Sequence, residues 1–247
     1  MNPCADKQNG FFRSIYYETY SEHITGQQKT TMNTDRDTRI EYWTEFLTVR
    51  NTVFDMLEKR GFDSSQLNRN ADPEFLLNQF NKLSDDSLYS CDIFVKEPTR
   101  RAYVHFVINP KDTAISLEER INKIAEAHGL DGARDDIDIV IFRQNMDPDS
   151  SFYSLEKNDK HSVRVFHYKS LMFDITKHSL VPPHSLVPKS EHAQLKKDLI
   201  IQHFKQLPIL LVSDPVSRFY HYRRGSVIRV ERPSIGNMKH IAYRYVL

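Results

Sequence analysis

Two apolar runs, Ala102–Ile108 (AYVHFVI) and Ile137–Phe142 (IDIVIF), set the architecture of this chain. Between them, Ser116-Leu-Glu-Glu119 has the form of a capping box, and apolar residues follow at helical spacing as far as Gly129. The second run is almost wholly apolar, which is typical of a strand buried on both faces. With a further strand expected at Val163–Tyr168, this order predicts an α/β sandwich with some parallel pairing.

A long amphipathic helix is expected before these strands, beginning near Thr38. Its apolar positions recur every three or four residues, and they are Ile40, Trp43, Phe46, Leu47, Phe54 and Leu57. Lys59 and Arg60 followed by Gly61 mark its end, because cations and then glycine are typical of a helix C-terminus. A second, shorter helix is expected at Pro73–Lys82, and Gln144–Lys160 is expected to be a polar loop.

Residues 1–37 are polar and are expected to form a flexible extension. Within them Phe11–Tyr20 carries five aromatic residues, which are either a docking peptide or a local cap on the first domain. Residues 38–172 then form the α/β domain, and residues 173–247 form a second domain. The sequence divides accordingly into an extension and two folded domains.

The second domain is expected to be a small α+β unit with a mixed sheet and two helices. The proline-rich stretch Leu180–Pro188 excludes a helix there. The expected elements are a helix at Ser190–Phe204, a strand at Ile209–Val212, a short helix after Ser213-Asp214-Pro215, a turn at Arg223-Arg224-Gly225, and strands at Ser226–Glu231 and His240–Val246.

Charge is unevenly distributed along the chain. From Asp174 to Leu247 there are 12 Lys and Arg against five Asp and Glu, whereas the preceding 173 residues hold 22 against 28. A basic C-terminal third indicates an acidic protein partner, nucleic acid, or simply a solvated basic surface. The two cysteines, Cys4 and Cys91, suggest a reducing compartment, and no apolar run is long enough for a membrane span.

The sequence offers no convincing active site. Its seven glycines contain no G-x-G pair and begin no phosphate-binding loop, and no lysine has Asp or Glu two positions before it, as many nucleases require. His178 and His184 are too few ligands for zinc and are expected to form hydrogen bonds within their loop. Asp136 and Asp138 can be read as paired carboxylates, but we interpret them as the point where a strand meets solvent.

The segment from Arg218 to Arg224 alternates cations with aromatic rings (RFYHYRR). Exposed rings between cations can stack on bases of single-stranded nucleic acid. The alternative is that the rings enter the core, because the segment lies between a short helix and a strand. The second interpretation is favoured.

Residues 174–247 resemble the assembly domain of the fifth subunit shared by the eukaryotic nuclear RNA polymerases, a domain that also has an archaeal counterpart. Five motifs follow the family in order and spacing. They are His178-Ser-Leu-Val-Pro-Pro-His184 (H-x-L-V-P-x-H in the family), Leu207-Pro-Ile209 (L-P-x-I), Asp214-Pro-Val-Ser-Arg-Phe219 (D-P-V-A-R-Y), Arg223-Arg-Gly-Ser-Val-Ile-Arg229 (K-R-G-x-V-V-K) and Tyr243-Arg244.

The resemblance is looser in the N-terminal domain. Trp43-Thr-Glu-Phe-Leu-Thr-Val49 is similar to a motif in the first helix of the family's jaw domain, which is α/β and nuclease-like. Gln144-Asn-Met-Asp-Pro148 stands where the family has a Q-N-N-x-T-P turn near downstream DNA, but it is shorter and acidic. His221 replaces a family glycine, which would allow close backbone approach or a positive φ. The chain therefore resembles a divergent or specialised member.

The resemblance implies a non-catalytic polymerase subunit with no cofactor and no metal. Its C-terminal domain would dock on the largest subunit, its jaw would contact downstream duplex DNA without sequence preference, and it would neither bind membranes nor form homo-oligomers. Interface candidates are His178, Val181, Pro182, His184, Asp214, Pro215, Arg218, Arg223, Arg224, Gly225 and Arg244. DNA-proximal candidates are Arg143, Gln144, Asn145 and Pro148.

The implied location is the nucleus, or a large-virus polymerase in host cytoplasm or virion. A free-standing DNA-binding or DNA-processing protein with a nuclease-like domain is the alternative function.

Overall fold

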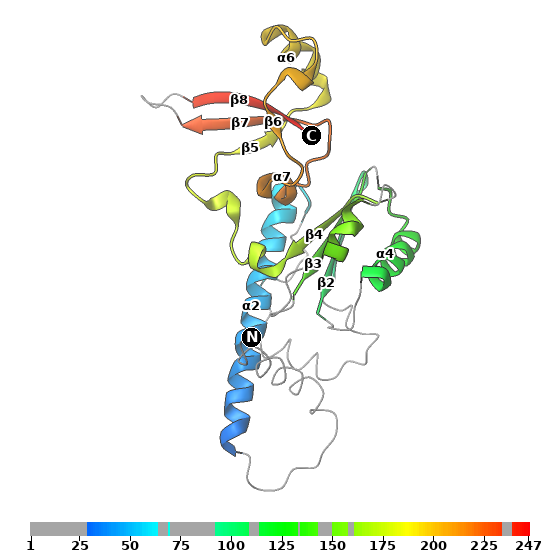
Figure 1. Ribbon diagram of the computed structural model, residues 1–247, viewed down its shortest axis with the longest axis vertical. Helices are drawn as coiled ribbons and strands as arrows, with labels where there is room; N and C mark the ends of the chain where they lie inside the picture. The colour runs from blue at the N-terminus through cyan, green and yellow to red at the C-terminus, as the bar shows by residue number, and fades with distance from the viewer. Residues whose placement is uncertain are drawn as a thin grey trace, which may run out of the picture. The chain divides into compact units, whose positions relative to one another are not determined.

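The computed structural model describes residues 29–63, 69, 92–108, 114–132, 134–142, 150–157, 161–233 and 239–247 (Figure 1). The chain divides into two compact units, Met1–Tyr42 and Trp43–Leu247. Helix α2 (Lys29–Lys59) runs through both. It begins nine residues before the predicted start near Thr38, and the intervening stretch contains no glycine or proline that would end it. Predictions for Phe11–Tyr20 and Pro73–Lys82 lie outside the described residues.

The first sheet has four strands in the order β1-β2-β3-β4. They are β1 (Ile93–Lys96), β2 (Arg101–Val107), β3 (Asp136–Ile141) and β4 (Val163–His167). Strands β2, β3 and β4 pair in parallel, whereas β1 pairs with β2 in antiparallel. The predicted mixed sheet with parallel pairing is confirmed. Strand β1 was not predicted, because a run of four residues is too short to give a clear strand pattern.

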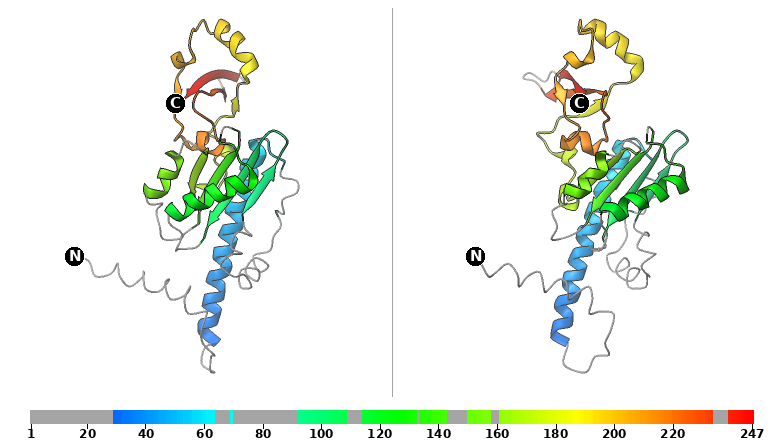
Figure 2. Two further views of the ribbon diagram at one scale, coloured as in Figure 1. Left: turned by 90° about the vertical axis from the view of Figure 1, so that its right-hand side faces the viewer. Right: turned by 45° about the vertical axis from the view of Figure 1, so that its right-hand side comes forward.

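Helices cover both faces of this sheet (Figure 2). Alternation along β3 turns Ile137, Ile139 and Ile141 into a core that they share with helix α4 (Ala114–His128). The opposite face receives Phe46 of α2, whose ring lies 5.2 Å from that of Phe142. The capping box predicted at Ser116 is wrong, because α4 begins two residues earlier. Among the described helices, none has the length and apolar character to cross a bilayer.

The predicted polar loop at Gln144–Lys160 contains two short helices instead. They are α5 (Ser150–Tyr153) and the 3₁₀ helix η3 (Ser154–Lys157). Phe152 and Leu155 project from them into the α4-side core and are almost fully buried. Two isolated apolar residues in a polar segment were too weak a pattern to predict this packing.

The second sheet has the order β5-β7-β8-β6. Its strands are β5 (His184–Leu186), β6 (Ile209–Leu210), β7 (Val227–Pro233) and β8 (Lys239–Val246). Only β6 and β8 pair in parallel, so the predicted mixed sheet is confirmed. The predicted α-helix at Ser190–Phe204 is wrong as one element. It divides into η6 (Lys189–Glu191), α6 (His192–Asp198) and η7 (Phe204–Gln206).

The two faces of the second sheet pack against different segments. Val227, with Tyr243 and Tyr245, packs with Leu195 of α6. Ile228, on the other face, packs with Leu210, Tyr222, Val230 and Val246. Because neighbouring residues of a strand point to opposite faces, α6 and the segment around Tyr222 lie on opposite sides of this sheet.

Phe46 offers a test of the α2-side core. Its side chain is fully buried and makes edge contacts with Trp43, Phe106 and Phe142. We expect Phe46→Ala to lower the free energy of unfolding by about 3–5 kcal/mol, because it removes a large apolar side chain and leaves a cavity. Urea unfolding of the full chain measures this. Ile115→Ala, at a site 74% exposed, is the control and should change stability by no more than about 0.5 kcal/mol.

Candidate functional site

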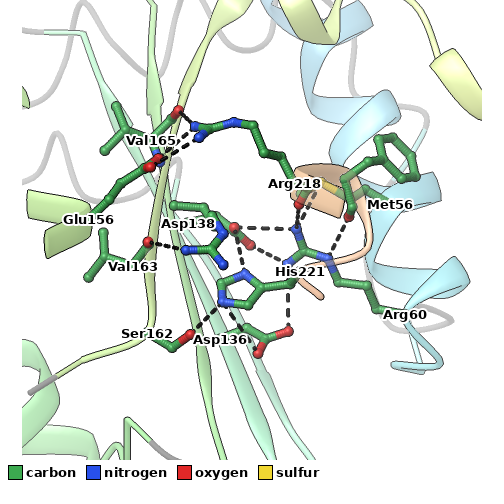
Figure 3. Close-up of polar contacts among 12 residues, drawn as sticks. Met56, Arg60, Asp136, Asp138, Glu156, Ser162, Val163, Val165, Arg218 and His221 are labelled. Atoms are coloured by element: carbon green, nitrogen blue, oxygen red, sulfur yellow. Dashed lines mark hydrogen bonds and ion pairs between the residues drawn. The ribbon is translucent and has the colours of Figure 1, made fainter. Parts of the chain in front are cut away.

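A cluster of buried charges joins the first sheet, helix α2 and residues 218–223 (Figure 3). At its centre is Asp138, in the middle of β3 and fully buried. Strand alternation turns Asp138 away from α4 and toward the face that α2 covers. The interpretation that Asp136 and Asp138 mark the point where a strand meets solvent is wrong, because α2 and residues 218–223 cover this end of the sheet.

Arg60, just after the last turn of α2, is the main partner of Asp138. Its Nη1 donates to Asp138 Oδ2 at 2.5 Å, and its Nη2 lies 3.3 Å from Oδ1. The same guanidinium donates from Nε to the Phe219 carbonyl at 2.8 Å and from Nη2 to the Arg218 carbonyl at 3.3 Å. One planar donor therefore connects a strand of the first domain to the carbonyl end of a helix in the second.

That second helix is α7 (Pro215–Phe219), which the sequence predicted. Asp214 caps it by accepting from the Val216 N–H at 2.8 Å, with proline in the first turn. The helix ends in a Schellman motif, in which the N–H of Tyr222 donates to the Ser217 carbonyl at 2.9 Å.

His221 occupies the left-handed position of this motif, with φ of 54°. The positive φ that a family glycine would allow is therefore present here with a histidine. The imidazole is buried, its Nε2 lies 2.7 Å from Ser162 Oγ, and its Nδ1 lies 3.4 Å from Asp138 Oδ1. These contacts offset the strain that a side chain meets in this conformation.

Two further arginines extend the cluster. Arg218 forms a bidentate pair with Glu156, with hydrogen bonds of 2.6 and 3.0 Å, and also donates to the Val165 carbonyl. Arg223 donates to Asp136 Oδ1 at 3.1 Å and to the Asp135 carbonyl at 3.2 Å. Both come from the second domain, and both bind groups of the first.

The electrostatics of the cluster favour an ionised Asp138. Burial on its own raises the pKa of this carboxyl, but the charge of Arg60 and the hydrogen bond and charge of His221 outweigh that penalty. The pKa of Asp138 therefore lies well below its ordinary value. Burial lowers the pKa of the nearby Arg164 guanidinium, which donates to the Tyr222 carbonyl at 3.4 Å.

A second, more exposed group of charges connects α2 to the start of the C-terminal domain. Lys59 Nζ lies 2.5 Å from Asp174 Oδ2, and Lys177 Nζ lies 2.6 Å from Asp55 Oδ2. Burial raises the pKa of Asp174, but hydrogen bonds from Lys59 and Thr176 outweigh it and leave that pKa lowered. These two ion pairs hold the segment around Asp174–Lys177, where the C-terminal domain begins, against helix α2.

The order Ser162–His221–Asp138 is that of a hydrolytic triad. A triad needs an imidazole that can deliver a proton to a substrate, yet His221 is 4% exposed and its carboxylate partner is already paired with Arg60. In the part of the chain that the structure describes, no group of three or more His, Cys, Asp or Glu could hold a metal ion. The geometry is that of a joint between domains.

The predicted interface residues fall into separate environments. Arg218, Arg223 and Asp214 are engaged within the chain, and Arg244 donates to the Ile209 carbonyl at 3.1 Å. The exposed candidates are His178, Pro215, Arg224 and Gly225, and the half-buried ones are Val181, Pro182 and His184. The DNA-proximal candidates Arg143, Gln144, Asn145 and Pro148 lie outside the described residues.

The two loop histidines form the local hydrogen bonds expected of them. His178 Nδ1 accepts from the Leu180 N–H at 3.2 Å, and His184 Nδ1 lies 2.6 Å from the Pro182 carbonyl. Burial lowers the pKa of His184. In the alternating segment, Phe219, His221 and Tyr222 are buried, so the interpretation that these rings enter the core is confirmed.

Arg60, Glu156, Ser162 and Arg164 were not recognised from the sequence as site residues. Arg60 was read only as a favourable cation at a helix end. The sequence did contain one signal for this site: a charged residue in the middle of an apolar strand, at Asp138 and at Arg164. Such a residue is buried only when an oppositely charged or hydrogen-bonding partner accompanies it, so its presence indicates a buried polar cluster.

Comparison with known proteins gives a family match in the C-terminal part of the chain and more distant relatives over most of its length. Residues 173–246 match the family described as RNA polymerase Rpb5, C-terminal domain. A Dictyostelium discoideum protein, DNA-directed RNA polymerases I, II, and III subunit rpabc1, is 26% identical over 80% of this chain and 95% of its own length. DNA-directed RNA polymerase subunit 5-like protein 1 of Arabidopsis thaliana is 24% identical over 83% of this chain and 96% of its own length.

A third relative is similar in a shorter region. DNA-directed RNA polymerase V subunit 5A of Arabidopsis thaliana is 34% identical over 84 residues, which are 34% of this chain and 37% of the relative. These similarities place the chain in the class of DNA-directed RNA polymerase subunits. Within that class, residues 173–246 belong to the Rpb5 family, and the chain as a whole is similar to divergent fifth subunits.

Asp138→Asn tests the buried joint. At pH 7 we expect it to lower the free energy of unfolding by about 3–5 kcal/mol, because it leaves the buried Arg60 charge with only its longer ion pair, to Asp136 at 3.7 Å. A depressed pKa means that the Asp138 contribution is complete above about pH 4, the ordinary value for aspartate, and is lost as pH falls below it. The difference between wild type and variant should therefore shrink toward low pH.

Urea unfolding at pH 7 and pH 3 measures both effects. Asp131→Asn is the control, because Asp131 is 52% exposed and its ion pair with Arg134 is 3.7 Å long. A difference between wild type and Asp138→Asn that stays constant with pH would contradict the assignment.

Proposed function

We propose that this chain is a non-catalytic structural subunit of a eukaryotic DNA-directed RNA polymerase. The observation that carries the proposal is similarity to polymerase subunits over nearly their whole length, combined with the family match at residues 173–246. The buried joint supports it, because a subunit that connects other components needs two domains held in one orientation. Catalysis would then belong to other subunits, and this chain would need no cofactor or metal of its own.

The C-terminal domain would dock on the largest polymerase subunit. Its surface supports this role: nine of the eleven large exposed apolar side chains among the described residues lie at or after Phe173. They are Phe173, Leu180, Leu186, Leu199, Ile200, Ile209, Leu211, Ile241 and Leu247. Concentration of exposed apolar side chains in one domain is typical of a surface that another protein covers. The excess of cations in this domain favours an acidic partner.

The N-terminal domain would act as the jaw that lines the downstream-DNA channel. Its mixed sheet between helices is consistent with the nuclease-like jaw of the family, but contact with the duplex would go through phosphates and carry no sequence information. The nucleus is the corresponding location for a eukaryotic polymerase subunit, since one relative is named as a subunit of RNA polymerases I, II, and III and another as a subunit of RNA polymerase V. The chain would join this complex as a single copy.

Assembly can be tested by co-purification. A tagged full-length chain expressed in its source cells should recover the largest polymerase subunit. Arg224→Glu should reduce that recovery by about tenfold, because it reverses an exposed charge where an acidic partner is expected. Arg134→Glu, at an exposed arginine of the first domain, is the matched control and should recover normal amounts. Absence of large polymerase subunits from the wild-type sample would instead favour a free-standing DNA-binding or DNA-processing protein.

DNA binding by the purified chain distinguishes the same two functions. We expect weak binding to duplex DNA, with equal affinity for unrelated sequences and a steep loss of affinity as salt rises, because only phosphate contacts would contribute. Fluorescence anisotropy with two duplexes of different sequence, at about 50 and about 200 mM salt, measures this. Tight binding to one duplex at the higher salt would identify the alternative function.

A further inference from the structure

Helices α6 and α7 end in the same backbone geometry, yet their end residues differ in environment. Ile200 and His221 each follow the last residues of a helix, and each has φ of 54°. At α6, the N–H of Ile200 donates to the Lys197 carbonyl at 3.2 Å, and that of Ile201 donates to the Lys196 carbonyl at 3.0 Å. Both helices therefore end in a Schellman motif, whose left-handed position is usually glycine.

Isoleucine is a poor residue for this position. Its branched Cβ approaches the following carbonyl oxygen in the left-handed conformation, so a β-branched residue there is a strained exception. At His221 the strain is offset by burial and by contacts with Ser162 and Asp138. Ile200, in contrast, is 92% exposed. Its strain is not offset by burial within the chain, although glycine or asparagine would form the same helix end without it.

The surroundings of Ile200 combine apolar and basic character. Leu199 is also exposed, and Ile201 is partly so. Lys196 and Lys197 stand in the last turn of α6. Residues 189–205 contain four lysines against two acidic residues, one of which, Glu191, is already close to Arg229 at 3.5 Å. The end of α6 thus presents an apolar tip with cations beside it.

We propose that Leu199 and Ile200 are the anchor of a protein-binding site, and that they fill an apolar pocket whose rim carries carboxylates. A side chain held outward by a fixed helix end loses little conformational freedom when it is bound. Lys196 and Lys197 favour negative charge at the rim of the partner's pocket. Residues retained in strained conformations cluster at ligand-contacting sites. The partner is therefore a protein surface that is apolar at its centre and acidic at its edge.

This site is separate from the joint that holds the two domains together. Helix α6 packs through Leu195 against the Val227 face of the second sheet, whereas Tyr222 and Val230 pack on the other face. Ile200 also lies outside the five family motifs. Leu199 and Ile200 are also among the exposed apolar side chains that support docking on the largest subunit, but the left-handed helix end at Ile200 carries this inference independently of that proposal.

The first measurement compares stability with binding in one variant. Ile200→Gly should raise the melting temperature of the purified full chain by about 2–4 °C, because it relieves the left-handed strain. In source cells, the same variant should lower recovery of the partner by about tenfold or more. Ile115→Ala, at the exposed isoleucine of α4, should leave recovery unchanged. Loss of binding with a gain in stability cannot come from misfolding.

The second measurement identifies the partner by its chemistry. Benzoylphenylalanine is incorporated at position 200, and in a matched sample at position 115, of the tagged full-length chain in source cells. Position 200 should crosslink, after irradiation, to a protein segment in which apolar residues are flanked by Asp or Glu, and position 115 should not. The protein that crosslinks should be the one that Ile200→Gly loses.

Several outcomes would overturn the inference. They are a crosslink only to a second copy of this chain or to nucleic acid, no crosslink at all, a fall in melting temperature on Ile200→Gly, or recovery of the crosslinked protein within about twofold of wild type. Polymerase recovered without a crosslink at position 200 would overturn this inference alone. A specific protein crosslink without any polymerase subunit would overturn the proposed function alone.

Discussion

The ion pair between Arg60 and Asp138 is the interaction on which the arrangement of the domains depends. A buried carboxylate in the middle of a strand is tolerated only with a compensating charge. Arg60 supplies that charge and uses its remaining donors on the carbonyl end of α7. The first domain therefore cannot satisfy its own buried arginine completely, because two of the acceptors belong to the second domain. His221 adds a second contact between the same two elements.

The ion pairs that surround Arg60 and Asp138 are more exposed to solvent than this central pair, and each contributes less stability. Arg218 and Arg223 contact groups of the first domain at the edge of the joint, whereas Lys59 and Lys177 contact Asp174 and Asp55 near the surface. Exposed pairs contribute little stability on their own, because water and salt screen them. Their effect here is geometric, since each holds a different point of the C-terminal domain against the first domain or α2. Divergence from the family at His221 is accommodated inside this network.

The sequence predicted most of this fold and little of the joint. Strands β2, β3 and β4 and the cap of α7 followed from local patterns: apolar runs, and Asp214 before proline. The start of α2, the start of α4 and the division of Ser190–Phe204 did not, because helix ends depend on backbone strain and tertiary packing. Asp138 was placed at solvent because its partner Arg60 lies 78 positions away, and no local pattern reports such a distance.

The long separation of these contacts also has a consequence for the order in which the chain acquires its structure during synthesis. The hydrogen bond from Arg60 to the Phe219 carbonyl spans 159 positions. At a translation rate of about 5–20 residues per second, the arginine leaves the ribosome roughly 8–30 s before its acceptor does. During this interval the Arg60 guanidinium of the nascent N-terminal domain lacks two of its acceptors, the carbonyls of Arg218 and Phe219.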